Sequence, residues 1–232
     1  MKKLLDRIFI DGLGGMAQGL FATLIIGTII QQIGLFMGGG TGDLIYELGK
    51  IAAGLTGAGI GVGVARKLEA GHLVIVSAAV VGMIGAFAGK ILSGQVLVDG
   101  NLVLAGPGEP LGAFAAAYLA IEIGILIWGK TILDVILTPL VCIGTGSAVG
   151  LFVGPPISEF MLWLGSLINW GTEQQPFLMG IVVSVLMGMI LTLPISSAAL
   201  GVILNLSGLA AGAATIGCCC NMIGFAVASW RE

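Results

Sequence analysis

Long apolar runs, interrupted by glycine, proline and charged residues, make up most of the chain. Between Gln174 and Trp230 there is no Asp, Glu, Lys or Arg. A helix needs only about 20 apolar residues to cross the hydrocarbon core of a bilayer, so this run is long enough for more than one crossing. Hydropathy and helix breakers together predict about seven spans. They lie at roughly 16–35, 45–65, 72–92, 110–129, 132–153, 177–194 and 208–229.

An additional inserted segment is predicted between the fifth and sixth spans. Residues 155–176 include Glu159, Glu173, Trp163 and Trp170, and they are too polar and too interrupted for an ordinary span. Indole rings favour the headgroup region, so we expect an interfacial or re-entrant helix there, beginning at a break. The predicted fold class is an all-α polytopic membrane helix bundle with seven or eight inserted segments and broken or re-entrant helices.

The composition supports a membrane protein and excludes two soluble classes. Apolar residues make up 57% of the chain and charged residues only 9%, whereas a soluble domain has about a quarter charged residues. The chain therefore cannot cover its own surface with charge. Nucleic-acid binding needs clustered Lys and Arg, and this chain has a net charge of −3 and no basic tract.

Glycine is unusually abundant, at 40 of 232 residues. In membrane bundles small residues let helix backbones approach closely. The segment Gly57–Gly63 superficially resembles a dinucleotide fingerprint, but that motif needs a preceding strand and a following acidic residue. Here a continuous apolar helix is expected, so we interpret the spacing of Gly57 and Gly61 as a helix-packing motif.

The basic residues predict the orientation, because cytoplasmic loops of membrane proteins are enriched in Lys and Arg. If each span crosses once, six basic residues fall on one side and three on or near the other. The six are Lys2, Lys3, Arg7, Arg66, Lys67 and Lys130, and the three are Lys50, Lys90 and Arg231. The N-terminus is therefore predicted to be cytoplasmic.

The sequence also contains a weak internal repeat. Aligning residues 19–23 with 180–184 places Gly27 on Gly188. The two segments would cross in opposite directions, as in the inverted repeats of many transporters. The chain would then be a single integral membrane domain, 1–232, with repeat-like halves at about 12–130 and 177–232. The second half is shorter, and either a truncated C-terminal part or a second copy of the chain would explain this.

The most informative helix break precedes the fourth span. Pro107 and Pro110, with three neighbouring glycines, flank the carboxylate of Glu109. Such a break frees backbone groups that must be buried in protein or line a cavity. Glu109 is therefore either a solvated loop carboxylate or a hydrogen-bonding group of a solute site. Glu122 lies deeper in the same span, where an acid is either functional or paired with a neighbouring helix.

Two further breaks occur, one at residues 154–159 and one at residues 192–197, and discontinuous helices are good pointers to a transporter site. Polar residues and a proline at or near the second break could bind hydroxyl groups of a solute. These candidates are Thr192, Pro194, Ser196, Ser197, Asn205 and Asn221.

Catalytic and metal-binding arrangements are not expected. His72 is the only histidine, and the four cysteines do not have metal-binding spacing. We therefore predict no catalytic residue, no metal and no cofactor.

Five ordered motifs resemble one known family. The motifs are Met16–Leu24, Gly57–Gly63, Gly106–Phe114, Leu191–Ala199 and Gly208–Ala214. With these motifs the chain resembles the enzyme IIC-like membrane proteins of the bacterial phosphotransferase system, in the branch that includes the perfringolysin O regulator. The resemblance implies a multi-pass protein of the bacterial plasma membrane, typically a homodimer, that works with cytosolic phosphoryl-carrier proteins in sugar uptake. Family members generally continue beyond the Trp-Arg-Glu end of this chain, and the usual phosphoryl-carrying domains are absent here.

Three functions remain open at this stage. The first is a permease that binds and translocates a small polar solute, a sugar or a related hydroxylated acid, and is at most the membrane subunit of a sugar phosphotransferase. The second is a membrane sensor or regulator that uses the same pocket. The third is a secondary transporter coupled to an ion gradient through the same acids.

Overall fold

The structure is a computed structural model, and it describes residues 6–98, 101–104, 106–130, 132–173, 175–192 and 208–229. Helices dominate, as the sequence predicts, and the strands form only one short hairpin. The elements are η1 (Arg7–Gly12), α2 (Leu13–Leu20), η2 (Phe21–Ile25), α3 (Ile26–Met37), α4 (Gly39–Gly54), α5 (Thr56–Lys67), α6 (His72–Leu92), β1 (Leu97–Val98), β2 (Asn101–Leu102), α7 (Pro110–Ile127), α8 (Asp134–Thr172), α9 (Pro176–Thr192) and α11 (Gly208–Ser229). The all-α class of a polytopic membrane protein is therefore confirmed.

Fewer helices than predicted meet the length and hydropathy of a membrane span. In the described ranges five helices do so, and the number is six if α4 and α5, which meet at an angle of 49°, form one broken span. Helix α9 is apolar but shorter. Exposed side chains on α3, such as Ile29, Ile33 and Phe36, are apolar, which fits a surface facing lipid. The count of seven or eight inserted segments stays a prediction.

The predicted break at Pro155 and Pro156 is wrong, because α8 continues through both prolines. Its apolar part, Asp134–Ile157, agrees with the fifth predicted span. Proline is tolerated within membrane helices because neighbouring groups and local adjustments satisfy the freed carbonyls. Residues 158–172 are therefore a continuation of the same helix and not a separate one.

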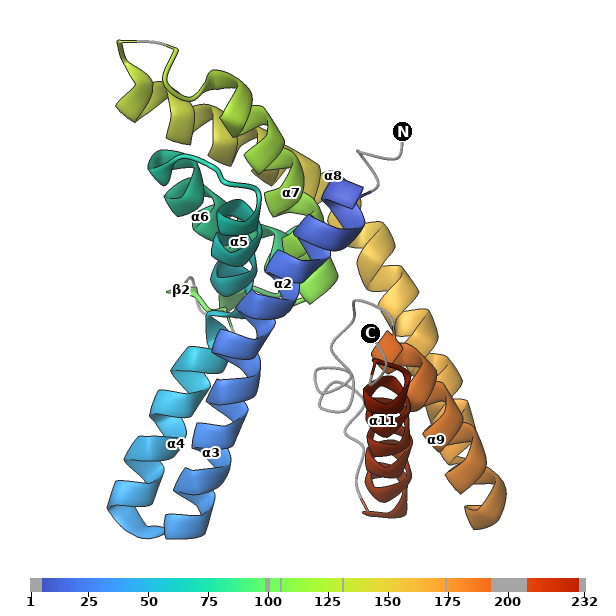
Figure 1. The fold of residues 1–232 in the computed structure, drawn as a ribbon. Helices are drawn as coiled ribbons and strands as arrows, with labels where there is room; N and C mark the ends of the chain where they lie inside the picture. The colour runs from blue at the N-terminus through green and yellow to red at the C-terminus, as the bar shows by residue number, and fades with distance from the viewer. Residues whose placement is uncertain are drawn as a thin grey trace. The chain divides into compact units, whose positions relative to one another are not determined.

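The chain forms two compact units, residues 1–158 and 159–232, and each is described by itself. In the first unit η1, α2, η2 and α3 form one continuous helical stretch of 31 residues. Helices α4 and α5 return beside it, α4 along α3 and α5 along α2 (Figure 1).

Glycines make the contacts between these helices, as their spacing predicts. A Cβ added to Gly15 would lie 2.6 Å from the carbonyl oxygen of Gly63, and one added to Gly27 would lie 2.6 Å from the amide nitrogen of Ala53. Neither position has room for a side chain. Gly57, in the segment that resembles a nucleotide motif, would meet the Gly82 carbonyl of α6 in the same way, at 2.6 Å. The segment is therefore a packing surface.

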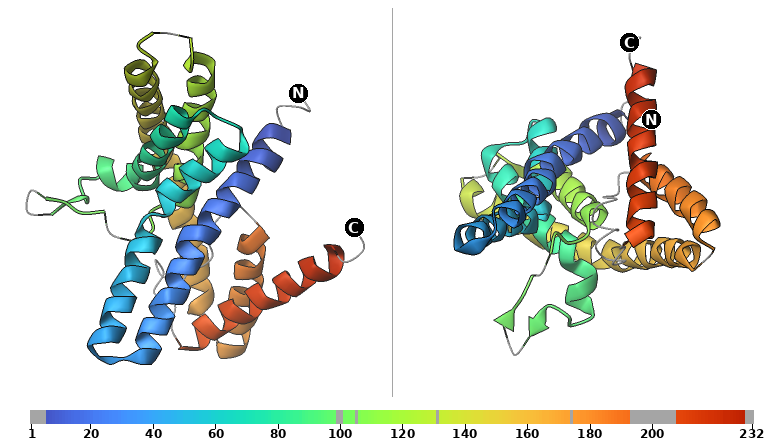
Figure 2. Two further views of the ribbon diagram at one scale, coloured as in Figure 1. Left: turned by 60° about the vertical axis from the view of Figure 1, so that its left-hand side comes forward. Right: turned by 90° about the horizontal axis from the view of Figure 1, so that it is seen from below.

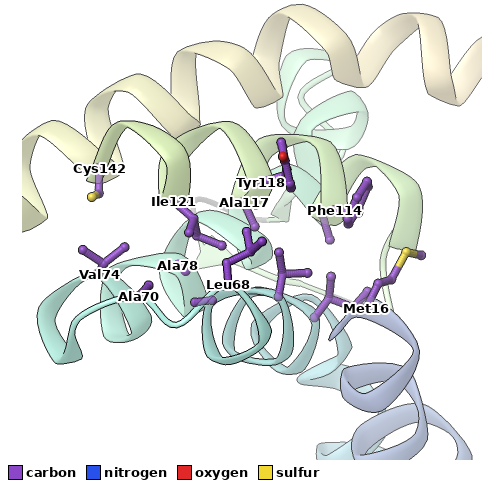
Figure 3. Close-up of a cluster of buried hydrophobic side chains, with 14 of the residues drawn as sticks. Met16, Leu68, Ala70, Val74, Ala78, Phe114, Ala117, Tyr118, Ile121 and Cys142 are labelled. Atoms are coloured by element: carbon purple, nitrogen blue, oxygen red, sulfur yellow. The ribbon is translucent and has the colours of Figure 1, made fainter. Parts of the chain in front are cut away.

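Helices α5, α6 and α7 all pack against one another, and the core of the first unit lies where these helices meet α2. Buried side chains from α2, α5, α6, α7 and α8 form one apolar cluster (Figure 3). Met16 enters it from α2, Val74 from α6, Phe114 and Ile121 from α7, and Cys142 from α8. This cluster fixes α7 against α6, and α7 carries both candidate carboxylates of the unit.

The second unit contains a close pair of helices, α9 and α11 (Figure 2). Gly217 of α11 touches the backbone of Ser184 so closely that no side chain would fit. Gly27 and Gly188, which the predicted repeat aligns, each lie at a helix contact within their own unit. This is compatible with an inverted repeat, which stays a prediction.

Candidate functional site

The loop before α7 has a backbone that requires glycine. Gly106 has a φ of 84° and Gly108 a φ of 70°, in the left-handed region that side chains disfavour. A Cβ on Gly108 would also lie 2.7 Å from the Cβ of Ala86 and 2.9 Å from its carbonyl oxygen. The loop is therefore pressed directly onto α6.

Glu109 is held in this loop by two backbone hydrogen bonds. Its amide donates to the carbonyl oxygen of Ala86 over 2.7 Å, and its own carbonyl accepts from the amide of Ala113 over 3.0 Å. The first bond joins Glu109 to α6, and the second is the first turn of α7. Pro110 follows at the first helical position, where its missing N–H is not needed. The backbone of Glu109 is thus fixed at the junction of two helices.

A glycine contact one turn into α7 makes this junction close. A Cβ on Gly85 of α6 would lie 2.6 Å from the carbonyl oxygen of Gly112, and a Cβ on Gly112 would lie 2.6 Å from that of Gly85. The two backbones therefore touch with no side chain between them. At the far end of the pair Gly124 packs against Val74, so α6 and α7 are antiparallel.

Burial changes the acidity of Glu109, which lies just outside the apolar stretch of α7. The side chain is half-buried, and desolvation raises its pKa from the ordinary 4.5 to about 7. The backbone amide of Leu111 and the ammonium of Lys90 act in the opposite direction and offset part of this rise. The carboxyl can therefore be protonated or ionised near neutral pH. In both forms it can hydrogen-bond a hydroxyl group.

Lys90 is the cation nearest in sequence to this junction, and sequence reasoning did not include it in the site. Its ammonium lies 5.5 Å from the ring centroid of Phe87, one turn earlier on α6. Phe87 is almost completely buried. Nothing in the local sequence joins Lys90 to Glu109, because a loop and a hairpin separate them along the chain.

Glu122, on the same helix, has a different environment. Its carboxylate accepts a hydrogen bond from the Nε of Arg7 over 2.6 Å, an ion pair between η1 and α7. The two side chains are 32% and 40% exposed, so the pair is not sealed in the core. The sequence left two interpretations of Glu122 open, a functional acid or an acid paired with a neighbouring helix. The structure shows the pairing, with Arg7 as the partner. Arg7 was expected only as a cytoplasmic anchor.

Tyr118 lies one turn before Glu122 and belongs to the core cluster. Its side chain is 8% exposed, and its hydroxyl has no hydrogen-bond partner in the described part of the chain. The ring lies 5.8 Å from that of Phe114 and anchors this part of α7 in the core.

The structure brings together only some of the predicted site residues. Pro107, Glu109 and Pro110 lie in one loop, while Glu122 is thirteen positions along the helix, about 20 Å away at 1.5 Å per residue. Thr192 is the last residue of α9. Four further candidates lie outside the described residues, namely Pro194, Ser196, Ser197 and Asn205.

Asn221 is described within the second unit. Its side-chain amide donates to the carbonyl oxygen of Gly188 over 2.8 Å and so joins α11 to α9. An open pocket of about 310 Å³ adjoins this bond, with Ser184, Gly217 and Cys220 among its lining residues. Interhelical hydrogen bonds of this kind hold membrane helices together.

Within the described ranges no three His, Cys, Asp or Glu side chains come together in an arrangement that could hold a metal ion. His72 is exposed at the start of α6.

Comparison with known proteins gives a single match. The model of the family described as "Phosphotransferase system, EIIC" matches residues 10–232. No curated protein and no solved structure matches the chain significantly. The family match covers nearly the whole chain, including every predicted span, and it agrees with the apolar helices of the structure. The chain therefore belongs to the EIIC family of the phosphotransferase system, as a multi-pass membrane component of such a permease.

Proposed function

We propose that this chain binds a small polar solute, a sugar or a related hydroxylated acid, and translocates it across the bacterial plasma membrane. Glu109 carries the proposal. Its backbone is fixed by two hydrogen bonds at the close junction of α6 and α7, and the pKa of its carboxyl is about 7. A fixed backbone reduces the conformational freedom that the residue loses when its carboxyl binds a solute hydroxyl.

The second carboxylate has a different proposed role. Glu122 pairs with Arg7 and would hold the first helix against α7, so its proposed role is structural. Pro107 and Pro110 would shape the loop, while Asn221, in the second unit, is a separate candidate for binding solute hydroxyls. The remaining proposed contributors are Thr192, Pro194, Ser196, Ser197 and Asn205.

The proposed permease does not need a catalytic centre of its own. Phosphoryl transfer depends mainly on positioning and electrostatic stabilisation, which phosphorylated cytosolic carrier proteins would supply. The chain would present the bound hydroxyl to such a partner. We also propose a homodimer, because the family resemblance implies one.

The arrangement of the first unit supports a cytoplasmic N-terminus. The Cε of Lys67 lies 3.7 Å from the position of a Cβ on Gly14, near the start of the first helical stretch. The ring of Trp128, two residues before Lys130, occupies the space beside Gly71. Lys67, Lys130 and the N-terminal end therefore share one end of the unit, as the positive-inside rule requires for a single side.

Uptake by the purified chain in liposomes tests this function. We expect accumulation of labelled solute that depends on a phosphorylated cytosolic partner and is lost in Glu109→Gln. Accumulation driven by an ion gradient alone would indicate the secondary transporter instead. Solute binding without any uptake would indicate the sensor.

A control variant separates loss of function from loss of folding. Lys50→Gln changes an exposed side chain on α4, which is far along the chain from the loop and pairs only weakly with Glu47. This variant should transport normally. If Glu109→Gln also transports normally, Glu109 is not part of the site.

A further inference from the structure

We propose that helices α3 and α4, called the arm below, tilt as one rigid body on the rest of the first unit, about a hinge made by η2 and by the break between α4 and α5. The motion belongs to the fold of the first unit and does not involve Glu109, so it goes beyond the proposed solute site. Three features point to it, namely the packing within the arm, its few contacts with the core, and the place of the two helix irregularities.

Small residues hold the two helices of the arm together along its length. A Cβ added to Gly27 would lie 2.6 Å from the amide nitrogen of Ala53, and one added to Gly34 would lie 2.6 Å from that of Tyr46. The buried residues of α3 and α4 are Gly27, Gly34, Gly42, Gly49 and Ala53. Because the two backbones touch near both ends of the pair, the arm should move as a single body.

The arm has little contact with the core of the first unit. Within the described residues, no side chain of α3 or α4 belongs to the core cluster, and besides each other the two helices pack mainly against η2. They extend away from α5, α6 and α7 (Figure 1). Large apolar side chains of the arm, such as Phe36 and Leu44, are exposed. A tilt of the arm would therefore leave the core intact.

Both helices that lead into the arm are irregular at the same level. The first helical stretch passes through the π-helical η2, and α4 meets α5 at an angle of 49°. The hydroxyl oxygens of Thr23 in η2 and Thr56 at the start of α5 lie 3.5 Å apart, so the two irregularities face each other. Short π segments within α-helices are frequent at functional sites, and they are a known cause of kinks. Two irregularities side by side define an axis for the tilt.

Threonine hydroxyls supply hydrogen bonds at both irregularities. Thr56 donates to the carbonyl oxygen of Ala53 over 2.6 Å, and Thr23 donates to that of Gly19 over 2.7 Å. Such bonds to a carbonyl one turn back often bend helices, and they satisfy carbonyls that a bend would otherwise leave free. On the core side of the hinge, α2 and α5 also touch through glycines. The irregular segment therefore lies between two close-packed helix pairs.

Distances between spin labels test the hinge on the full chain in lipid nanodiscs, with the four native cysteines replaced by alanine. Labels are attached at Phe36→Cys and Ile51→Cys in the arm and at Val76→Cys and Phe152→Cys in α6 and α8, where all four side chains are exposed. The pair Phe36–Val76 joins arm and core. The pair Phe36–Ile51 lies within the arm, and Val76–Phe152 lies within the rest of the first unit; both are controls.

Only the arm-to-core pair should report movement. Helix α4 has 16 residues and is about 24 Å long, so loss of the whole 49° bend would move its tip by about 20 Å. We expect two populations separated by about 5 Å or more for Phe36–Val76, a quarter of the full movement, as for a hinge. Each control pair should give one narrow population.

The variant Thr56→Val tests whether the hinge lies at the break. Valine has nearly the shape of threonine but cannot bond to Ala53 or Thr23, so the population with the 49° bend should decrease. Thr23→Val should act in the same direction from the other side of the hinge. Thr145→Val is the matched control and should leave all three distances unchanged, because its hydroxyl bonds to Val141 within α8.

Four results would overturn the proposal. An arm-to-core distribution as narrow as that of Val76–Phe152 would show that the arm is fixed. An equally broad distribution within the arm would show that its helices move separately, and one within the rest of the unit would show that the whole unit is loose. If the arm moves but neither Thr56→Val nor Thr23→Val changes its populations, the hinge is not at these residues. None of these results concerns Glu109, so the proposed function would stand in each case.

Discussion

Two carboxylates on one helix, Glu109 and Glu122, have opposite environments. Glu109 precedes the first turn of α7, is fixed through its backbone, and has a side chain that burial pushes towards the neutral form. Glu122 lies within the apolar stretch and is joined through its side chain to Arg7. The carboxylate of Glu122 binds Arg7 and so joins a second helix to α7. Glu109 is joined to α6 by its backbone, so its carboxyl is not needed for this contact.

The difference between Glu109 and Glu122 separates two roles for an acid in an apolar chain, binding a neighbouring helix and binding a solute. An acid at membrane depth is costly and needs a partner or a function. Glu122 has a partner, through an ion pair between two helices. A carboxyl at a helix break, such as that of Glu109, is typical of a functional acid.

Gly112→Leu should disturb both carboxylates, because it acts on the helix that carries them. A Cβ at Gly112 would lie 2.6 Å from the Gly85 carbonyl oxygen, so α7 must move away from α6. Overpacking of this kind destabilises by about 1–3 kcal/mol or more. Thermal unfolding of the detergent-solubilised chain should show a large decrease in Tm. Gly144→Leu is the matched control, since a Cβ there meets nothing within 4 Å and should leave Tm nearly unchanged.

Glu122→Gln and Arg7→Gln should each reduce stability by about 1–3 kcal/mol, because each leaves a polar partner unsatisfied. The double variant should lose less than the sum, as expected for residues in direct contact. Thermal unfolding of the four proteins in parallel measures this coupling. Strictly additive losses would contradict an energetically important ion pair. Solute affinity per folded molecule should stay close to that of the wild type in all three variants.

Glu109→Gln should show the reverse pattern. Removing the charge but keeping the size should weaken solute binding by about 1.5–3 kcal/mol, the range for a hydrogen bond to a charged group. Tm should not fall below the wild-type value, since the backbone bonds to Ala86 and Ala113 do not involve the side chain and an amide carries no charge to bury. Calorimetry and thermal unfolding on one sample distinguish the outcomes. A lower Tm with unchanged affinity would make Glu109 a structural residue.

The pH dependence of stability should report the burial of Glu109. Burial raises the Glu109 pKa from 4.5 to about 7, so the folded chain binds more protons than the unfolded chain between these values. The contribution of Glu109 to stability is therefore fully present below pH 4.5 and is lost as pH rises through about 7. Comparing wild type with Glu109→Gln across this range isolates the effect. The difference should persist in an Arg7→Gln background, and a flat difference would contradict the raised pKa.

Lys50→Gln should have the smallest effect. The Lys50 ammonium lies 3.5 Å from the Glu47 carboxylate, and both side chains are more than half exposed. Exposed pairs of this kind contribute about 0–1 kcal/mol. The Tm of this variant should be within experimental scatter of the wild type. A change as large as that of Glu122→Gln would show that exposure does not explain the difference between the two ion pairs.

Several features of the fold followed from sequence patterns because their causes are local. Apolar runs of sufficient length form helices in a bilayer, since an unpaired backbone polar group in hydrocarbon is strongly unfavourable. The break at Gly106–Pro110 was predictable because proline cannot donate and only glycine readily accepts the observed φ angles. The glycines of α5 were interpreted correctly as packing positions for the same kind of reason, namely the absence of a side chain.

The continuity of α8 shows where a local rule fails. Pro155 and Pro156 predicted the start of a separate segment, yet the helix continues to Thr172. Pro155 and Pro156 each remove one backbone N–H donor. The other hydrogen bonds of this helix of 39 residues remain. The two prolines do interrupt the hydrogen bonds of the helix locally. The sequence did not show that the helix continues past them.

The sequence by itself determined that this chain is a glycine-rich membrane helix protein with an acid at a helix break, because length, hydropathy and backbone preference belong to single segments. Only the tertiary structure decided which charges meet. Arg7 and Glu122 are 115 positions apart, and their contact depends on the packing of the first helical stretch against α7. The charge of Lys90 acts on the carboxyl of Glu109 across a helix contact that Gly85 and Gly112 make close. No property of either segment alone contains that information, since an ion pair is set by distance in space and not by position along the chain.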